Sequence, residues 1–375
     1  MPLPPDRLLR PSLRDFAPYT PGTSADEVRR RLGIERPVKL SQNENPLGTS
    51  PRALAALERC DELSVYADEE HLALRTKLAA PHGLSAANTI LGHGSNELLQ
   101  LAFLTLVDPG DEVVMAAPSF SLVRKDAAIF GALLREVPLR NGVHDLEAML
   151  AAVTPRTKIV FVCDPNNPTG TRVEPRELAA FAEALPDDVL LLLDQAYREY
   201  MDEGGAEGTA LIARRPATLV LRTASKIYGL AAVRFGYGFA SPTVIEWLNR
   251  ARLPFNVAAP AVRAVEAALD DREFVAASRE NNQRGKAFLT TELRRLGVHA
   301  FPSDANFVAL EVPGRADDAY RDLLTRGLIV RSGDGLGMPG RLRVSIGTPH
   351  DNARFIEIFE VLLPAWRGAA AGVAS

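Results

Sequence analysis

Short, continuously apolar runs recur between residues 89 and 240, separated by longer helical patterns. Six runs have the length of strands: TIL (89–91), EVVMA (112–116), KIVFVC (158–163), VLLLL (189–193), TLVL (218–221) and YGFA (237–240). They do not alternate apolar with polar residues, which is typical of strands covered by helices on both faces. The pattern predicts an α/β domain with a mostly parallel central sheet flanked by helices.

The pattern changes after Pro260. Residues 261–296 carry apolar positions at three- and four-residue steps among many charges, which predicts one long helix. Strand-like runs follow at 306–312, 328–332 and 341–347, and a closing helix is expected at 352–363. These elements predict a smaller α+β domain. We expect three parts: residues 1–45 as an N-terminal arm and part of the small domain, 46–262 as the large domain, and 263–375 as the C-terminal small domain.

Composition and charge narrow the classes of function. The chain has 375 residues, enough for two packed domains, and its 46% hydrophobic and 24% charged content is ordinary for a globular protein. A net charge of −4 disfavours a nucleic-acid-binding or basic membrane-surface protein. The longest apolar run near the middle, residues 189–193, is too short to span a bilayer.

The cysteines, histidines and N-terminal residues predict a cytoplasmic protein without a metal site. Residues 1–16 are rich in proline and arginine and have no apolar segment, so we expect no secretory signal. Cys60 and Cys163 cannot form a disulfide framework, which favours a reducing cytoplasm. No pair of histidines has the spacing of metal ligands. Cys163 lies in an apolar run, and we predict a buried core residue there.

Polar groups suited to catalysis follow four of the predicted strands. In open parallel sheets, ligands bind at the carboxyl ends of the strands. The segments found there are GHGSNELL (92–99), DPNNPTG (164–170), DQAYREY (194–200) and RTASKIYGLAAVRFG (222–236). They would bring to one edge a helix N-terminus, an asparagine, an aspartate with a tyrosine, and a lysine with hydroxyls and an arginine.

Each of these features alone has an ordinary structural explanation. Ser95 or Asn96 could cap a helix, and so could Asp194. The asparagine and proline of DPNNPTG could form only a turn. Arg234 and Lys226 could be solvated surface charges. The occurrence of all five features at one sheet edge is what favours a functional site.

Together these groups fit one cofactor, pyridoxal phosphate. A lysine forms a Schiff base with its aldehyde, and an aspartate keeps its ring nitrogen protonated, which makes the ring an electron sink. Asparagine and tyrosine donors can bond to its phenolate oxygen. Hydroxyls, an arginine and a helix N-terminus can bind its phosphate. A nicotinamide dehydrogenase is disfavoured, because the glycine-rich segment 332–340 is not followed by a helical pattern.

Several motifs resemble a known family. PNNPTG, DQAYREY, RTASKIYGLAAVRFGYG and RLRVSIGT are similar, in order and spacing, to the fold-type-I (class I/II) pyridoxal-phosphate-dependent aminotransferases, from about residue 40 to residue 358. LSQNENPLGTSP, YADEEHLALRTKLA, LGHGSNELL and PFNVAAPA resemble the histidinol-phosphate aminotransferase branch. The chain departs from that branch in YAD, where tyrosine-proline-aspartate is common, and in Gln195, where an acid is usual.

The resemblance implies a role for each matching residue. Lys226 would be the Schiff-base lysine and Asp194 would pair with the pyridine nitrogen. Tyr197 and Asn167 would bond to the phenolate oxygen. The other contacts to the cofactor within the subunit would come from Gly94, Ser95, Asn96, Phe120, Thr223, Ser225 and Arg234. Tyr66 would reach the phosphate from the neighbouring subunit of a homodimer with shared active sites. The expected substrate contacts are Tyr19, Asn43, Arg331 and Arg343.

The implied reaction transfers the amino group of histidinol phosphate to 2-oxoglutarate. It would yield imidazole acetol phosphate and glutamate in histidine biosynthesis, with ping-pong kinetics through Lys226. The alternative is an aromatic amino-acid aminotransferase on the same scaffold. A coenzyme-binding regulator without turnover is disfavoured, because the enzyme-like region and a short tail use all 375 residues. The expected partners are the amino donor, 2-oxoglutarate and a second copy of the chain, and we expect neither nucleic acid nor membrane.

Overall fold

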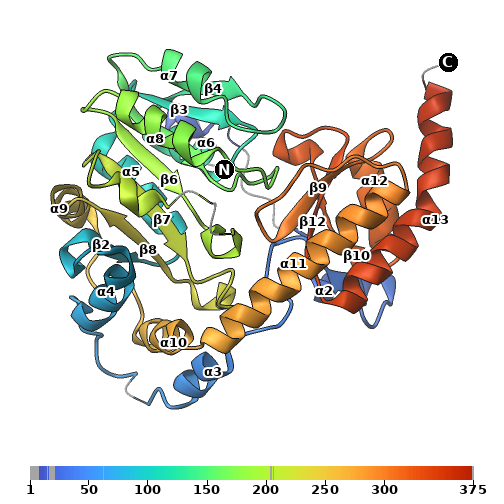
Figure 1. The fold of residues 1–375 in the computed structure, drawn as a ribbon, viewed down its shortest axis with the longest axis horizontal. Helices are drawn as coiled ribbons and strands as arrows, with labels where there is room; N and C mark the ends of the chain where they lie inside the picture. The colour runs from blue at the N-terminus through green and yellow to red at the C-terminus, as the bar shows by residue number, and fades with distance from the viewer. Residues whose placement is uncertain are drawn as a thin grey trace.

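A seven-stranded sheet forms the centre of the larger part of the molecule (Figure 1). The computed structural model describes residues 8–14, 16, 22–61, 63–202, 205 and 207–373, with side chains up to residue 370. The strands, in spatial order, are β2 (Thr89–Gly92), β8 (Gly236–Ala240), β7 (Thr218–Thr223), β6 (Leu190–Asp194), β5 (Thr157–Cys163), β3 (Glu112–Ala117) and β4 (Leu133–Pro138). The five strands from β7 to β4 are parallel, and β8 is antiparallel to both of its neighbours.

This sheet confirms the predicted α/β class and the six predicted strands, but a seventh strand was missed. Strand β4 lies at the sheet edge, and most of its residues are exposed or half-buried. Its sequence, LLREVP, therefore carries Arg135 and Glu136 in place of an apolar run. An edge strand that is exposed to solvent does not need the continuous hydrophobicity that revealed the central strands.

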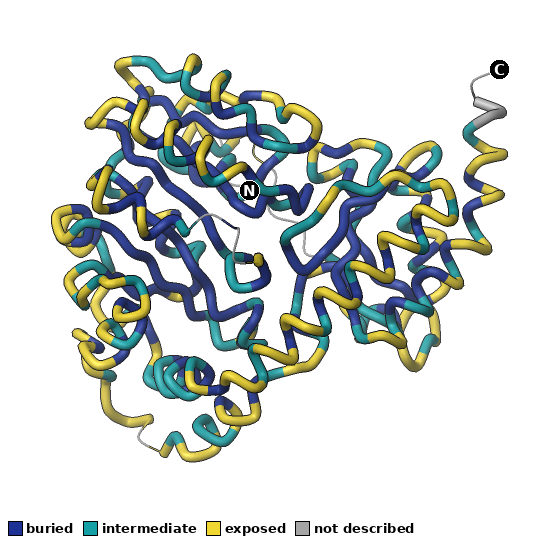
Figure 2. The backbone as a smooth tube through the Cα atoms, in the orientation of Figure 1, coloured by how far each residue is buried: buried dark blue, intermediate teal, exposed yellow. Residues whose placement is uncertain are grey.

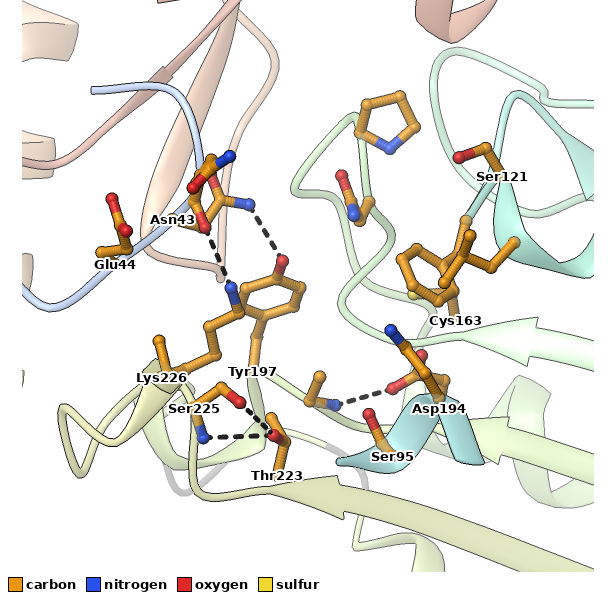
Figure 3. A pocket seen from close by; sticks show the side chains of 18 of the residues that line it. Asn43, Glu44, Ser95, Ser121, Cys163, Asp194, Tyr197, Thr223, Ser225 and Lys226 are labelled. Atoms are coloured by element: carbon orange, nitrogen blue, oxygen red, sulfur yellow. Dashed lines mark hydrogen bonds between the residues drawn. The ribbon is translucent and has the colours of Figure 1, made fainter. Parts of the chain in front are cut away.

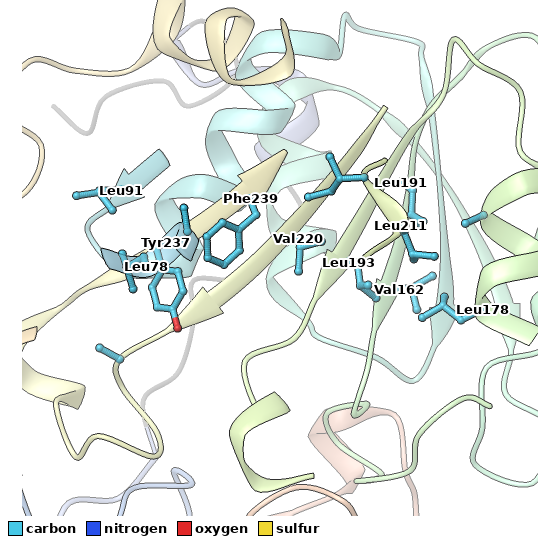
Figure 4. Close-up of a cluster of buried hydrophobic side chains, with 14 of the residues drawn as sticks. Leu78, Leu91, Val162, Leu178, Leu191, Leu193, Leu211, Val220, Tyr237 and Phe239 are labelled. Atoms are coloured by element: carbon cyan, nitrogen blue, oxygen red, sulfur yellow. The ribbon is translucent and has the colours of Figure 1, made fainter. Parts of the chain in front are cut away.

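Hydrophobic side chains cover both faces of the large sheet, which explains why its central strands are apolar throughout. On one face Leu191 and Val220 pack with Leu178 (Figure 4). The helices that contribute to this cluster are α3 (Pro51–Glu58), α4 (Leu72–Ala79), α7 (Leu146–Ala151), α8 (Pro175–Ala184) and α10 (Ala259–Leu269). On the other face Leu190 and Leu219 pack against α5 (Ser95–Leu106), α6 (Leu122–Phe130) and α9 (Pro242–Ala251). Figure 2 shows the central strands as buried backbone.

Two small sheets build the second part of the molecule, on the right of Figure 1. Strands β11 (Arg331–Ser332), β12 (Arg341–Ser345) and β9 (Phe307–Glu311) form an antiparallel sheet. Strand β1 (Val38–Lys39) pairs in parallel with β10 (Leu328–Ile329), which brings the N-terminal segment to this part. The surrounding helices are α2 (Ala25–Leu32), α11 (Arg272–Arg295), α12 (Ala316–Thr325) and α13 (Pro349–Val373).

The single long helix expected over residues 261–296 is wrong. Helix α10 ends at Leu269 and α11 begins at Arg272. The carboxylate of Asp271 caps α11 by accepting from the Phe274 amide at 3.3 Å, and it also accepts from the Ser50 hydroxyl at 2.6 Å. Because a capping aspartate favours non-helical backbone, the chain turns here. Helix α10 then packs on the large domain, while α11 crosses to the small one (Figure 1).

The predicted domain boundaries at residues 45 and 262 remain a proposal, which the membership of the sheets supports. All strands of the large sheet lie between residues 89 and 240, and β9 to β12 lie beyond residue 306. Strand β1 belongs to the N-terminal segment and pairs with β10, as part of the small domain would. Among the described residues, none of the helices has both the length and the apolar character that a membrane span requires.

Asp126, a buried carboxyl group on α6, is expected to make stability depend on pH. Burial raises the pKa of Asp126 from 3.8 to about 6, and Gln100, at 3.5 Å, opposes the shift. The protonated form therefore stabilises the fold below pH 4, and this contribution is lost as the pH rises to 6. Relative to Asp126→Asn, the free energy of unfolding should fall by about 3 kcal/mol over that interval. Urea unfolding of both proteins at pH 4 and pH 7 measures the difference. An equal change in the free energy of unfolding between these pH values in both proteins would contradict the assignment.

Candidate active site

A cavity of about 610 Å³ lies where the carboxyl ends of the large sheet face the small domain. Its walls come from the ends of β5, β6 and β7, the first turn of α5, the segment after β1, and strands β11 and β12. Thirteen residues predicted for the site line it: Asn43, Ser95, Asn96, Phe120, Asn167, Asp194, Tyr197, Thr223, Ser225, Lys226, Arg234, Arg331 and Arg343. The fold thus gathers most of the predicted set.

Lys226 lies in the loop after β7 and points toward the small domain (Figure 3). Its ammonium donates a hydrogen bond to the Gln42 carbonyl oxygen at 3.0 Å and lies 5.9 Å from the centre of the Tyr197 ring. Burial, assisted by the positive charge of Arg343, lowers the pKa of Lys226 to about 8. An amine with this pKa is partly neutral near pH 7, which a nucleophile or a general base requires.

Asp194 is the last residue of β6 and lies beside the end of β5. Its carboxylate is almost wholly buried and accepts from the Ala196 amide at 3.0 Å. Burial raises the pKa of Asp194 to about 6, although the Ala196 amide and Lys226 oppose the shift. A cationic partner would stabilise the charged form of the group in this position.

Tyr197 and Asn43 connect the two sides of the cavity. The Asn43 side-chain amide donates to the Tyr197 hydroxyl at 2.9 Å (Figure 3). The Asn43 backbone amide donates to the Ser345 hydroxyl at 2.9 Å. Asn43 has a φ of 56°, a left-handed conformation that asparagine tolerates better than most residues. Burial raises the pKa of Tyr197 to about 12, so this phenol keeps its proton and can donate it to a ligand.

The first turn of α5 forms an anion-binding corner with the loops after β7 and before β8. The Thr223 hydroxyl donates to the Ser225 hydroxyl at 3.0 Å, and Arg234 donates to the same oxygen at 3.4 Å. Gly94 has a φ of 79°, and a Cβ atom there would collide with the Arg234 guanidinium. Gly94 itself does not line the cavity but allows Arg234 to approach the helix. A helix N-terminus, two hydroxyls and a guanidinium together favour a phosphate.

Two arginines line the cavity on the side of the small domain. Arg343 donates to the Asn167 side-chain oxygen at 2.6 Å and to the Ser41 carbonyl at 2.6 Å, and its guanidinium stacks 5.3 Å from the centre of the Phe307 ring. Arg331 is its direct partner across β11 and β12, so both side chains leave the same face of the sheet. Two neighbouring guanidiniums suit a substrate with a doubly charged anionic end.

Besides Gly94, one described residue that was predicted for the site lies away from the cavity. Tyr66 does not line it. It is 80% exposed, and its ring stacks on Phe255 with 4.6 Å between the centres. A contact from Tyr66 to a cofactor would therefore have to be made in another subunit, as the prediction requires. Tyr19 lies outside the described residues.

Other wall residues were not predicted. Gln42 and Glu44 flank Asn43 and line the cavity, and Gln42 accepts from Lys226. Their position in the quoted segment SQNENP could have indicated them. Lys125 also lines the cavity from α6, but its position in a helix gave no indication of that. Cys163 is buried, as predicted, and its side chain also forms part of the wall.

Comparison with known proteins agrees with this geometry. Residues 35–359 match the family model described as aminotransferase class I and II. Histidinol-phosphate aminotransferase 2 of Carboxydothermus hydrogenoformans is 42% identical, with 95% of this chain and 99% of the relative covered. The Moorella thermoacetica histidinol-phosphate aminotransferase is 43% identical, with 94% and 92% covered. The crystal structure of histidinol-phosphate aminotransferase from Sinorhizobium meliloti in complex with pyridoxal-5'-phosphate superposes with a TM-score of 0.85 at 26% identity, covering 96% and 98%. The chain therefore belongs to the class I and II aminotransferases.

Proposed function

We propose that the protein is a pyridoxal-phosphate-dependent aminotransferase that transfers the amino group of histidinol phosphate to 2-oxoglutarate. The products would be imidazole acetol phosphate and glutamate, formed in the cytoplasm during histidine biosynthesis. The observation that carries this proposal is one cavity that holds Lys226 and Asp194 together with the adjacent arginines Arg331 and Arg343. The names of the relatives support histidinol phosphate as the donor.

The wall of the cavity fits pyridoxal phosphate. When bound, this group supplies an aldehyde that condenses with amines and a ring that withdraws electrons from the attached carbon. The anion-binding corner suits its phosphate, because Gly94 lets Arg234 approach the N-terminus of α5. Asp194, a buried carboxylate that a cation would stabilise, suits the ring nitrogen, and the protonated Tyr197 suits the phenolate oxygen. Asn167 and Phe120 line the cavity and would provide a second donor and a stacking face.

Each of the main side chains would have a different role in the reaction. Lys226, with a pKa of about 8, would take the proton from the α-carbon of the donor in its neutral form and later return a proton. Asp194 would keep its negative charge beside the ring nitrogen while the electrons of the α-carbon are delocalised. The hydrogen bonds of Asn43 to Tyr197 and Ser345 would hold the small domain, and with it Arg343, at a constant distance from this chemistry.

The donor can be identified in a half-reaction. The purified yellow protein, without a keto acid, is mixed with histidinol phosphate or with phenylalanine, and the loss of coenzyme absorption is followed at several concentrations. Rapid conversion at low histidinol phosphate, with a much weaker response to phenylalanine, is expected. The reverse order would make the protein an aromatic amino-acid aminotransferase. No colour after addition of pyridoxal phosphate would overturn the coenzyme assignment.

Arg331→Ala should weaken the binding of histidinol phosphate more than the binding of phenylalanine. A charge-assisted hydrogen bond contributes about 1.5–3 kcal/mol, so the half-saturating concentration of histidinol phosphate should rise about 10- to 100-fold. Phenylalanine, which presents one carboxylate, should depend mainly on Arg343. Stopped-flow titration of both donors measures the effect, and Arg326→Ala, an exposed arginine at the end of α12, is the control. Equal effects on both donors would contradict a role in binding phosphate.

We also propose a homodimer, which an exposed apolar patch supports. Leu63, Val65 and Tyr66 follow α3, and Leu253 and Phe255 follow α9. All five are exposed, and Tyr66 stacks on Phe255. Exposed apolar side chains that pack on one another, as Tyr66 and Phe255 do, are typical of surfaces that bind another protein. A second copy of the chain on this patch would cover it and could bring its Tyr66 to the neighbouring phosphate.

Mixing two inactive variants tests whether the sites are shared. Lys226→Ala and Tyr66→Ala should each be impaired as pure dimers. After joint refolding, half of the dimers are hybrids, and one of the two sites in each hybrid has both residues intact. Activity should then recover to about a quarter of the wild-type value. Recovery no greater than the sum of the two pure variants would show that Tyr66 acts within its own subunit or not at all.

A further inference from the structure

A buried polar network lies on the side of β6 and β7 that faces away from the cavity. Because side chains alternate along a strand, Gln195 projects opposite to Asp194, and Arg222 projects opposite to Thr223. Gln195 is 0% exposed, and Arg222 is 4% exposed. Neither lines the cavity. The network is thus one peptide unit away from residues of the site without being part of its wall.

Arg222 is the centre of this network. Its guanidinium donates to Glu207 at 2.6 Å, to the Gln195 side-chain oxygen at 3.2 Å and to Glu199 at 3.3 Å. The Gln195 oxygen also accepts from the Gly208 amide at 3.2 Å. The side-chain oxygen of Gln195 therefore connects the end of β6 to the arginine of β7 and to the start of the 3-10 turn η5 (Gly208–Leu211).

The same network reaches the loop that carries Lys226 and the helix between the domains. Tyr237, the partner of Arg222 across β7 and β8, donates to Glu199 at 3.4 Å. Tyr228, two residues after Lys226, interacts electrostatically with Glu199 and Arg222. Arg279 of α11 donates to the Glu199 carbonyl at 2.9 Å. A displacement of Arg222 would therefore shift the end of β6 at Asp194 and the loop that carries Lys226.

The ion pairs around Arg222 balance in charge, because residue 195 is neutral and Arg279, a further positive group, is exposed to solvent. Arg222 and Arg198 are positive, and Glu199 and Glu207 are negative, with Arg198 at 3.4 Å from Glu207. His82 lies 3.9 Å from Glu207, and burial lowers its pKa, so it is neutral at pH 7. The amide of Gln195 supplies an acceptor to Arg222 without adding charge. A carboxylate at this position would place a third negative charge in a fully buried environment, which is costly.

We propose that Gln195 is a positioning residue, matched to Glu207, which keeps the charge beneath Asp194 and Lys226 balanced and the end of β6 in place. This inference rests on the proposed coenzyme and its attachment to Lys226. It predicts that the carboxylate and the amide can be exchanged between positions 195 and 207, because both contact the same guanidinium. It also predicts that changing either one alone disturbs the site.

The test compares Gln195→Glu, Glu207→Gln and the double variant as full-length holoenzymes. The readout is the pH midpoint of the change in coenzyme absorption, which reports the proton on the nitrogen of Lys226. Gln195→Glu should raise the midpoint by about one pH unit, because an added negative charge favours the protonated form. Glu207→Gln should lower it, and the double variant should return to the wild-type value. The cavity charges that face Lys226 are unchanged in all three proteins: Asp194, Glu44, Arg234 and Arg343.

A control and a second measurement separate the possible outcomes. Thr243→Glu adds the same charge at an exposed position on α9 and should leave the midpoint unchanged. Thermal unfolding of the same set gives a double-mutant cycle for residues 195 and 207. Unchanged absorption midpoints in all variants, or additive losses in unfolding temperature, would overturn the proposal. If Gln195→Glu does not fold, an unchanged midpoint in Glu207→Gln would overturn it. A colourless wild type would instead overturn the coenzyme assignment, while the unfolding cycle would still decide whether the network is coupled.

Discussion

Replacing Lys226 with alanine is expected to lower the rate of transamination by about 10⁴-fold or more. The residue is the amine of the cavity whose pKa, about 8, allows a neutral base near physiological pH. Alanine removes both the attachment point for the coenzyme and the group that moves the proton. The anion-binding corner formed by Ser225 and Arg234 remains, so the variant should still bind pyridoxal phosphate.

Steady-state rates with histidinol phosphate and 2-oxoglutarate, and the absorption spectrum of the bound coenzyme, measure this effect. Lys77→Ala is a suitable control, because Lys77 forms a partly exposed ion pair with Asp270, and such pairs contribute about 0–1 kcal/mol. Its turnover should equal that of the wild type. Substantial turnover by Lys226→Ala would defeat the assignment of this residue.

Asp194→Asn is expected to lower turnover by about 10²- to 10³-fold, because removing one partner of a buried charge pair costs about 2–5 kcal/mol. Asparagine has nearly the same shape but cannot supply the negative charge that keeps a ring nitrogen protonated.

In the coenzyme-free protein, the same substitution should increase stability. Burial raises the pKa of Asp194 to about 6, so the buried charge destabilises the fold above that pH and its removal should increase the free energy of unfolding.

Asp126→Asn provides a matched control for this change. Asp126 is also buried, and burial likewise raises its pKa to about 6, but it does not line the cavity. Its replacement should stabilise the protein near pH 7 without a loss of turnover. If both variants lost turnover equally, the effect would come from the removal of any buried carboxylate and not from a specific role of Asp194.

The fold of the large domain could be predicted well from local patterns, because its strands are buried on both faces. A strand in that position must be apolar throughout, and six strands are visible as short apolar runs. Strand β4 could not be found in this way, since it is exposed at Arg135 and Glu136, on both of its faces. The break between α10 and α11 was also missed. The helical periodicity continues across it, and only the capping contacts of Asp271 with Phe274 and Ser50 reveal it.

The candidate site, like the fold, could be predicted from the sequence only in part. Asp194 ends strand β6, and Tyr197 and Lys226 lie in the loops just after β6 and β7, so their convergence at one edge could be inferred from the order of the elements. The Arg331–Arg343 pair depends on the register of β11 and β12. Asn43 meets Ser345 across a separation of 302 residues.

The sequence by itself therefore determined the α/β class, the cofactor-binding motifs and the family, because these depend on residue type and spacing along single strands and loops. Only the tertiary structure decided which groups complete the cavity and which lie beneath it. Gln42 and Lys125 enter the wall, and Gln195 joins Arg222 and Glu207, through contacts between segments distant in the chain. The packing of both domains sets such contacts, and no local pattern of residues records them.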